Sequence, residues 1–309
     1  MSFFLLCLPI FAVVGLGWVA VKMRLVHAGG TEALGAFSFR FALPALVLRL
    51  IAGGPLGQSF SPRFFVGYLA SGSLIFAGMF VFSRLLQRRG ATTAGARATT
   101  ATVSNLGFLG PPIVLTFFGE HGAGPLAMAI VCEVMILMSV GAVIMAGADK
   151  AAAAGALILQ STFYNPVIAA ILIGGAIAAS GLALPQPLDG FLGFLGASAA
   201  PTALFAVGGA LGVQRIDRTT AHAAAGISLV KLLIYPLLVW CLLAYVLHLE
   251  PLWIGVGVLI ASLPSAGSNY VLAQHYAADA DQVSAAIVLS TIASVVTVPC
   301  VGWLVVRSG

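Results

Sequence analysis

Residues 105–114 read NLGFLGPPIV and interrupt a long apolar stretch with an asparagine, two glycines and two adjacent prolines. Each of these residue types weakens an α-helix. A second interruption, SLPSAGSNYV at residues 262–271, lies within another apolar stretch. The meaning of such interruptions depends on whether water or lipid surrounds the chain. The amino-acid composition indicates which of the two it is.

The composition is that of a membrane protein. The 309-residue chain is 61% hydrophobic and 7% charged, with a mean hydropathy of +1.09. Soluble domains carry roughly 25% charged residues, so this chain lacks the polar surface that a water-soluble fold needs. We therefore expect an all-α polytopic membrane protein. The net charge of +5 does not indicate nucleic-acid binding, because no basic face with interleaved aromatic residues is present.

Ten segments have the length and hydrophobicity of membrane-spanning helices, which need about 20 apolar residues each. The predicted spans are 3–21, 33–53, 64–86, 98–118, 124–147, 163–182, 189–211, 222–247, 252–274 and 283–306. The cations outside them, together with Arg84 at the end of span 64–86, gather at the connections after the odd-numbered spans: Lys22, Arg24, Arg84, Arg88, Arg89, Arg97, Lys150, Arg215 and Arg218. The other side carries Arg63 and Arg307. The positive-inside rule then predicts that both termini are extracellular or periplasmic.

The two interruptions are related by an internal repeat. A shift of 157 residues aligns several prolines and glycines without a gap: Pro9 with Pro166, Gly17 with Gly174, Pro44 with Pro201, and Gly110 with Gly267. Chance coincidence is the alternative reading. The repeat divides the chain into two five-span halves, 1–150 and 158–309. Because five is odd, the second half enters the membrane from the opposite side, and inverted repeats of this kind are typical of secondary transporters.

Each interruption creates a new helix N-terminus at membrane depth. Unwound backbone survives there only inside protein or along a watery cavity. The free N–H groups and the helix dipole give such an N-terminus partial positive charge, which suits a carboxylate. Pro112 is suited to a first helical turn, and Ser265, Ser268 and Asn269 are candidate caps of the second half-helix. The alternative is that these residues only kink packed helices.

The predicted substrate site comprises the residues at both interruptions. They are Asn105, Gly110, Pro111, Pro112, Pro264, Ser265, Gly267, Ser268, Asn269 and Tyr270. We expect Asn105 and Asn269 to contact the substrate directly, because an amide both donates and accepts hydrogen bonds without adding a buried charge.

Charged residues inside the predicted spans are the other functional candidates. An intramembrane carboxylate such as Glu133 either accepts a coupling proton or neutralises a cation. Lys231 either attracts the substrate carboxylate or pairs with Glu133. We expect Arg49 and Arg40 to extend toward the membrane interface instead. No HExxH motif or His/Cys cluster is present and the four cysteines lie far apart, so neither a metal nor a cofactor is expected.

At the two interruptions the sequence resembles the auxin efflux carrier family, which includes the plant PIN carriers and bacterial malonate-type transporters. Asn105, Gly110 and Pro112 match the spacing of the family's fourth span, and Leu263 with Pro264 match its ninth. Further stretches resemble its second, sixth and eighth spans: FALPALVLRLIA (41–52), NPVIAAILIGG (165–175) and VKLLIYPLL (230–238). The sequence departs from the plant pattern at Asn269, where those carriers have proline, and in its short link between the halves.

The resemblance implies a fold and a mechanism. Spans 1, 2, 6 and 7 would form a scaffold that also joins two copies in a dimer. Spans 3–5 and 8–10 would form a moving transport domain around crossed spans 4 and 9. It implies elevator-type alternating access for a small organic anion, malonate-like or auxin-like, in a bacterial inner membrane. The coupling ion, a proton or sodium, is left open.

Three other functions are alternatives to an organic-anion carrier. The GASA sequence at 196–199 has a serine but no mid-span histidine to act as its base, so an enzyme is not expected. A channel is a second alternative. A sodium-coupled bile-acid-type symporter is the third, because its repeat architecture is similar and Ser265, Ser268 and Asn269 offer oxygen ligands.

Overall fold

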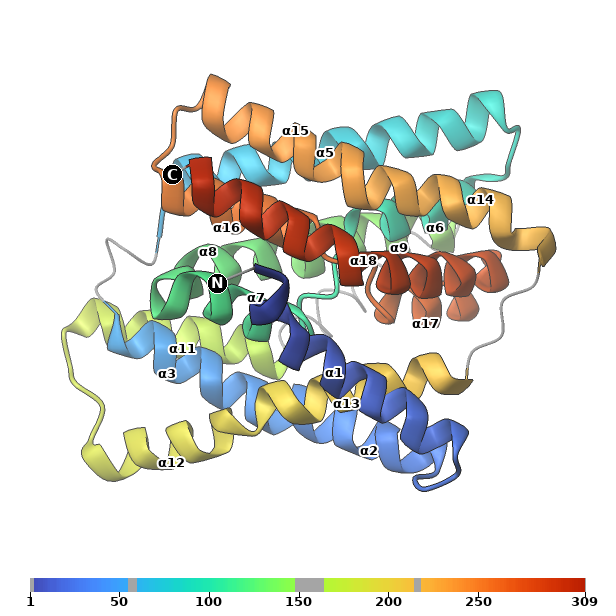
Figure 1. Cartoon of the computed structure of the whole chain (residues 1–309). Helices are drawn as coiled ribbons and strands as arrows, with labels where there is room; N and C mark the ends of the chain where they lie inside the picture. The colour runs from blue at the N-terminus through green and yellow to red at the C-terminus, as the bar shows by residue number, and fades with distance from the viewer. Residues whose placement is uncertain (1–2, 55–59, 148–163, 214–217, 309) are drawn as a thin grey trace. The chain divides into compact units, whose positions relative to one another are not determined.

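The computed structural model describes residues 3–54, 60–147, 164–213 and 218–308 (Figure 1). Over those ranges the chain is helical and forms no strand beyond one isolated bridge between Ser104 and Ser265. Lys150, with most of the predicted link between the halves, and Arg215 lie outside the described residues.

The chain folds into two compact units. Unit 1 is Met1–Ser61, Leu106–Ala127 and Phe163–Gln214. Its helices are α1 (Phe3–Lys22), α2 (Ala28–Phe37), η1 (Ser38–Ala42), α3 (Leu43–Gly53), α7 (Gly110–Phe118), η3 (Gly119–Gly122), α11 (Pro166–Ser180), α12 (Gln186–Ala197) and α13 (Ala199–Val213). It therefore collects the helices of predicted spans 1, 2, 6 and 7, to which α7 is added.

Unit 2 is Pro62–Asn105, Met128–Thr162 and Arg215–Gly309. Its helices are α5 (Pro62–Val81), η2 (Phe82–Leu86), α6 (Ala91–Thr102), η4 (Val131–Leu137), α9 (Met138–Ala146), α14 (Arg218–Leu229), η6 (Val230–Ile234), α15 (Tyr235–Cys241), η7 (Leu242–Val246), α16 (Pro251–Ala261), α17 (Ser268–His275) and α18 (Ala280–Ser308). Residues of α8 (Ala123–Ile130) contribute to both units.

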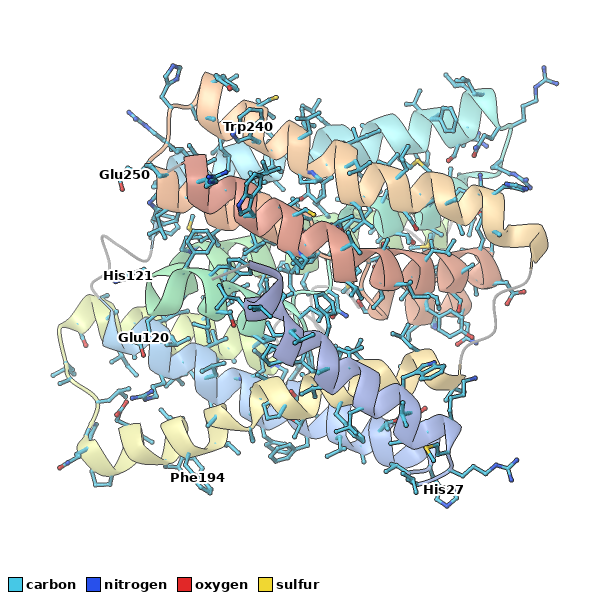
Figure 2. The ribbon with its side chains drawn as sticks, in the orientation of Figure 1. His27, Glu120, His121, Phe194, Trp240 and Glu250 are labelled. Carbon is cyan, nitrogen blue, oxygen red and sulfur yellow. The ribbon has the colours of Figure 1, made fainter. Side chains whose placement is uncertain are left out.

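The helices and their outer surfaces suit a lipid environment. Seven helical runs among the described residues are long and apolar enough to cross a membrane: Leu5–Lys22, Ala28–Gly53, Pro62–Leu86, Gly110–Ala146, Gln186–Val213, Ala221–Val246 and Ala280–Val305. Shorter apolar helices cover Pro166–Ser180 and Pro251–Ala261. Large apolar side chains also face outward, such as Phe194 on α12, which is 87% exposed (Figure 2). The protein is therefore a multi-pass membrane protein.

In unit 1, α1 and α13 pack backbone against backbone (Figure 1). A Cβ added at Gly208 would collide with the carbonyl oxygen of Val14, and one added at Gly17 would collide with that of Phe205. Small residues at such crossings let membrane helices approach closely enough for dense van der Waals packing.

Arg49 makes an ion pair that the sequence did not predict, while its extension to the membrane interface stays a prediction. Its Nε donates to Asp189 Oδ1 at 2.7 Å and its Nη2 to Asp189 Oδ2 at 3.3 Å. This two-pronged ion pair ties α3 to α12 within unit 1. Arg40 is exposed on η1, and its extension to the interface stays a prediction.

In unit 2, α6 begins at Ala91 and not at residue 98, where the predicted span began. Arg97, expected in a polar connection, lies inside this helix with only 2% exposure. The helix is rich in threonine, but its buried hydroxyls are satisfied locally: Thr99, Thr100 and Thr102 each donate to the backbone carbonyl four residues earlier. These bonds leave none of the three hydroxyls unpaired, which lowers the cost of burying them.

Candidate functional site

The helices are interrupted at both places that the sequence indicated. The chain leaves the helical conformation between α6 and α7, from 103 to 109, and between α16 and α17, from 262 to 267. Pro111 and Pro112 lie in the first turn of α7, where proline needs no N–H partner. The predicted caps of α17 are wrong: its N-cap is Gly267, and no side chain caps it.

The two unwound segments pair with each other. The backbone N–H of Asn105 donates to the carbonyl of Pro264 at 2.8 Å, and that of Ala266 donates to the carbonyl of Val103 at 3.0 Å. The hydroxyl of Ser265 extends the contact by donating to the carbonyl of Thr100 at 2.7 Å. Since lipid offers no hydrogen bonds, this pairing is what lets both breaks persist inside the unit. We call this paired region, residues 103–105 and 262–267, the crossover.

The two asparagines at the crossover keep unused hydrogen-bonding groups. Asn269 is 3% exposed; its Nδ2 donates to the carbonyl of Val103 at 3.3 Å, while its buried Oδ1 has no partner among the described residues. The Asn105 side chain is 6% exposed, and the structure gives it no hydrogen bond within the described part of the chain. Buried polar groups left without partners are uncommon, which singles out Asn269 Oδ1. Substrate contact by Asn105 and Asn269 stays a prediction.

The other predicted substrate residues are distributed over both units. Pro264 and Ser265 are buried in the crossover, Gly267 and Ser268 are exposed beside it, and Tyr270 is partly exposed. Gly110, Pro111 and Pro112 are buried in unit 1. Their roles in binding stay predictions.

Glu133 lies in η4, fully buried, and its carboxylate accepts four hydrogen bonds. Oε1 accepts from Tyr68 Oη at 2.6 Å, from Ser104 Oγ at 3.0 Å and from Tyr235 Oη at 3.2 Å. Oε2 accepts from the backbone N–H of Ser104 at 2.6 Å. A carboxylate buried away from bulk solvent needs such donors to offset the loss of its hydration.

Lys231 lies in η6, and its ammonium is likewise fully buried. Nζ donates to Ser104 Oγ at 2.8 Å and to the carbonyl of Ala261 at 2.6 Å, and lies 4.8 Å from the centroid of the Tyr235 ring. Among the described residues, Glu133 and Lys231 form no direct ion pair; the Ser104 hydroxyl links them by accepting from Lys231 and donating to Glu133. Of the two predicted roles of Lys231, substrate attraction or pairing with Glu133, the structure shows an indirect form of the pairing, in which the Ser104 hydroxyl lies between the two charges.

Both charged residues lie in π-helical turns, which are wider than α-helical ones and are frequent at functional sites. Sequence reasoning singled out both charges but missed Ser104 and Tyr68 as their partners. Ser104 directly precedes Asn105 in the interruption, which is a usable signal. Tyr68 is an ordinary span tyrosine and carries no such signal.

Arg97, midway along α6, makes a separate polar contact. Its Nη1 donates to Gln87 Oε1, and its Nη2 lies 3.7 Å from Asp279 Oδ2 in the connection between α17 and α18. This contact ties the first helix of one interruption to the chain that follows the other.

Comparison with known proteins shows the family to which this chain belongs. The model of the membrane transport protein family matches residues 2–301. The chain belongs to this family, as its resemblance to the auxin efflux carriers predicted. It is a membrane transporter and not an enzyme.

Three relatives of this transporter match nearly the whole chain. A putative malonate transporter of Rhizobium meliloti is 30% identical, over 98% of this chain and 96% of its own length. An uncharacterized transporter of Methanothermobacter thermautotrophicus is 28% identical and the uncharacterized transporter YfdV of Escherichia coli is 23% identical, each over 97% of this chain and 96% of its own. Groups of His, Cys, Asp and Glu that could hold a metal ion are absent from the described residues.

Proposed function

We propose that this protein is a secondary transporter that moves a small organic anion, bound at the crossover, across a bacterial inner membrane. The observation that carries the proposal is the pairing of two unwound segments beside Asn269, whose buried Oδ1 has no hydrogen-bond partner among the described residues, and beside the buried Asn105. In secondary transporters, substrate sites lie near the midplane at discontinuous helices. An amide offers a donor to a carboxylate and an acceptor to a hydroxyl or a protonated carboxyl group.

Dicarboxylates of malonate size are the first substrates to test. One relative is named a putative malonate transporter, and it aligns with almost all of this chain. Auxin-like aromatic acids are the second class, since the family resemblance includes the plant carriers. In either class the Nδ2 groups of Asn105 and Asn269 donate to the carboxylate, and the unpaired Asn269 Oδ1 accepts from a hydroxyl or a protonated carboxyl group. Lys231 is already engaged by Ser104 and Ala261.

The proposed mechanism is elevator-type alternating access. Ten spans, arranged as two inverted five-span halves, supply a scaffold from spans 1, 2, 6 and 7 and a transport domain from spans 3–5 and 8–10. The scaffold also joins two copies in a homodimer, and both termini face the periplasm. The hydrogen-bonded crossover favours this mechanism, because it moves as one piece instead of opening between its helices.

Substrate binding in detergent tests the proposal. Thermal unfolding of the purified protein is followed with malonate and a series of other carboxylates, for the natural chain and for Asn105→Ala and Asn269→Ala. We expect a saturable rise of the unfolding temperature, and an affinity at least about tenfold weaker in each variant, which corresponds to about 1.4 kcal/mol.

The matched control is Gln186→Ala, which removes an exposed amide at the start of α12 in unit 1 and touches no residue of the predicted substrate site. Its affinity should equal that of the natural chain. If both asparagine variants fold normally and bind as tightly as this control, the site is not at the crossover.

A further inference from the structure

The ammonium of Lys231 lies at the carboxyl end of an interrupted helix. Ala261, whose carbonyl accepts its 2.6 Å bond, is the last residue of α16. In a continued helix this carbonyl would accept from the N–H of Ser265, but that N–H donates to Ser290 Oγ at 3.1 Å instead. The carbonyl is therefore an orphan acceptor with partial negative charge, which suits a cation.

The remaining surroundings of Nζ are also those of a cation site. The Ser104 hydroxyl oxygen lies 2.8 Å away, the face of Tyr235 lies 4.8 Å away, and the Glu133 carboxylate lies beyond Ser104 as the counter-charge. In transporters with broken helices, unwound carbonyls and half-helix carboxyl ends are where coupling sodium ions or protons are held. Here a protein side chain occupies such a position.

We propose that the Lys231 ammonium fills a cation site built into unit 2 and takes the place of a coupling sodium ion, so that substrate transport proceeds without sodium. The part of this inference that concerns transport rests on the proposed function; the part that concerns the site does not. Ser104 belongs to one unwound segment and Ala261 ends the helix before the other. A cation that contacts both holds the two segments together.

Tethering the cation has a mechanical consequence. A sodium ion can leave, and the carbonyl and hydroxyl that held it then lose their partner. Lys231 cannot leave, so the crossover stays paired in every state of the transport cycle. The buried charges of Lys231 and Glu133 also stay balanced at all times, which avoids the large cost of one unpaired charge in a dry interior.

Removing the tethered cation should open the site to a free one. We compare Lys231→Ala, which leaves a space, with Lys231→Met, which keeps the volume without the charge. Thermal unfolding is measured in detergent, without substrate, in sodium, potassium, methylammonium and choline chloride at one ionic strength. Choline is the control because it is too large for the space.

For the natural chain we expect the same unfolding temperature in all four salts. Both variants should unfold at a temperature roughly 5–15 °C lower in choline, since a partner of a buried charge has been removed. Lys231→Ala should recover at least half of this loss in methylammonium or sodium, saturably, and Lys231→Met should recover none. Equal behaviour of the two variants in every salt would overturn the assignment, and so would a sodium-stabilised natural chain.

A second variant covers the case in which Lys231→Ala does not fold. Glu133→Gln combined with Lys231→Met removes both charges, and we expect it to unfold at a higher temperature than Lys231→Met alone. A double variant no more stable than the single one would contradict the charge balance. Because none of these measurements uses a substrate, their failure is distinguishable from failure of the proposed function.

Discussion

Ser104 is the residue on which the buried charges depend. It offers Glu133 both its N–H and its hydroxyl, and the same hydroxyl oxygen accepts from Lys231. The sequence predicted the two charges as functional candidates because charged residues in apolar spans are conspicuous. It could not predict their link, because that link depends on an unwound segment reaching between η4 and η6.

Removing the Ser104 hydroxyl should destabilise the protein. Ser104→Ala deletes two buried hydrogen bonds to charged groups while the backbone N–H still contacts Glu133, so we expect a loss of about 1–3 kcal/mol. Thermal unfolding in detergent measures the change. The control is Ser180→Ala on an exposed surface of α11, which should alter stability by less than about 0.5 kcal/mol. Equal effects of both changes would contradict the central role of Ser104.

The two tyrosines on Glu133 should differ in importance. Tyr68 donates at 2.6 Å and Tyr235 at 3.2 Å, and short bonds to a carboxylate are the strong ones. Tyr68→Phe should therefore lower stability by about 1.5–3 kcal/mol, and Tyr235→Phe by clearly less, since phenylalanine keeps the ring next to Lys231. The unfolding midpoints of the two variants show which tyrosine contributes more to stability. A larger loss for Tyr235→Phe than for Tyr68→Phe would contradict the prediction.

At the scale of helices, interruptions were predictable and a buried polar helix was not. Gly and Pro break a helix through their own backbone geometry, so the interruptions at residues 103–109 and 262–267 could be predicted from the sequence. The start of α6 was misplaced because its threonines and Arg97 read as a polar connection, and only tertiary packing shows that its hydroxyls bond within the helix. The cap predicted for α17 failed because Ser265 and Asn269 bond across the crossover instead.

Close helix packing in unit 1 gives a prediction at this scale. Gly208→Ala puts a methyl group against the carbonyl of Val14, so α1 and α13 must separate and we expect a loss of about 1–3 kcal/mol. Gly175→Ala is the control, because nothing lies within 4 Å of its added Cβ and alanine favours a helix. Thermal unfolding should show one variant destabilised and the other unchanged or stabilised. If both variants unfold like the natural chain, the crossing is not tightly packed.

For the whole molecule, composition alone was enough to predict the membrane class, and motif order was enough to predict the family. Seven helical runs of spanning length appear among the described residues, whereas ten spans in two inverted halves stay a prediction. The difference arises because two predicted spans are shorter helices and one begins with the polar α6. Hydropathy along the sequence identifies apolar stretches, and it therefore misplaced the start of α6, a polar helix that is buried within the protein.

Orientation is a prediction for the whole molecule. The cations outside the spans gather on one side, so both termini should face the periplasm of a bacterial host. Alkaline phosphatase fused after Gly309 should then be active, and green fluorescent protein at the same position should be dark. The reverse pattern would place the termini in the cytoplasm and invert the assignment of every connection.

Uptake into proteoliposomes tests the central claim most directly. Purified protein is reconstituted, and entry of radiolabelled malonate is followed under a proton gradient, a sodium gradient or neither. We predict saturable uptake that does not require sodium and that falls at least about tenfold in Asn105→Ala but not in the control Gln186→Ala. Uptake that never saturates would indicate a channel, strict sodium dependence would indicate a bile-acid-type symporter, and undiminished uptake by Asn105→Ala would contradict substrate binding at the crossover.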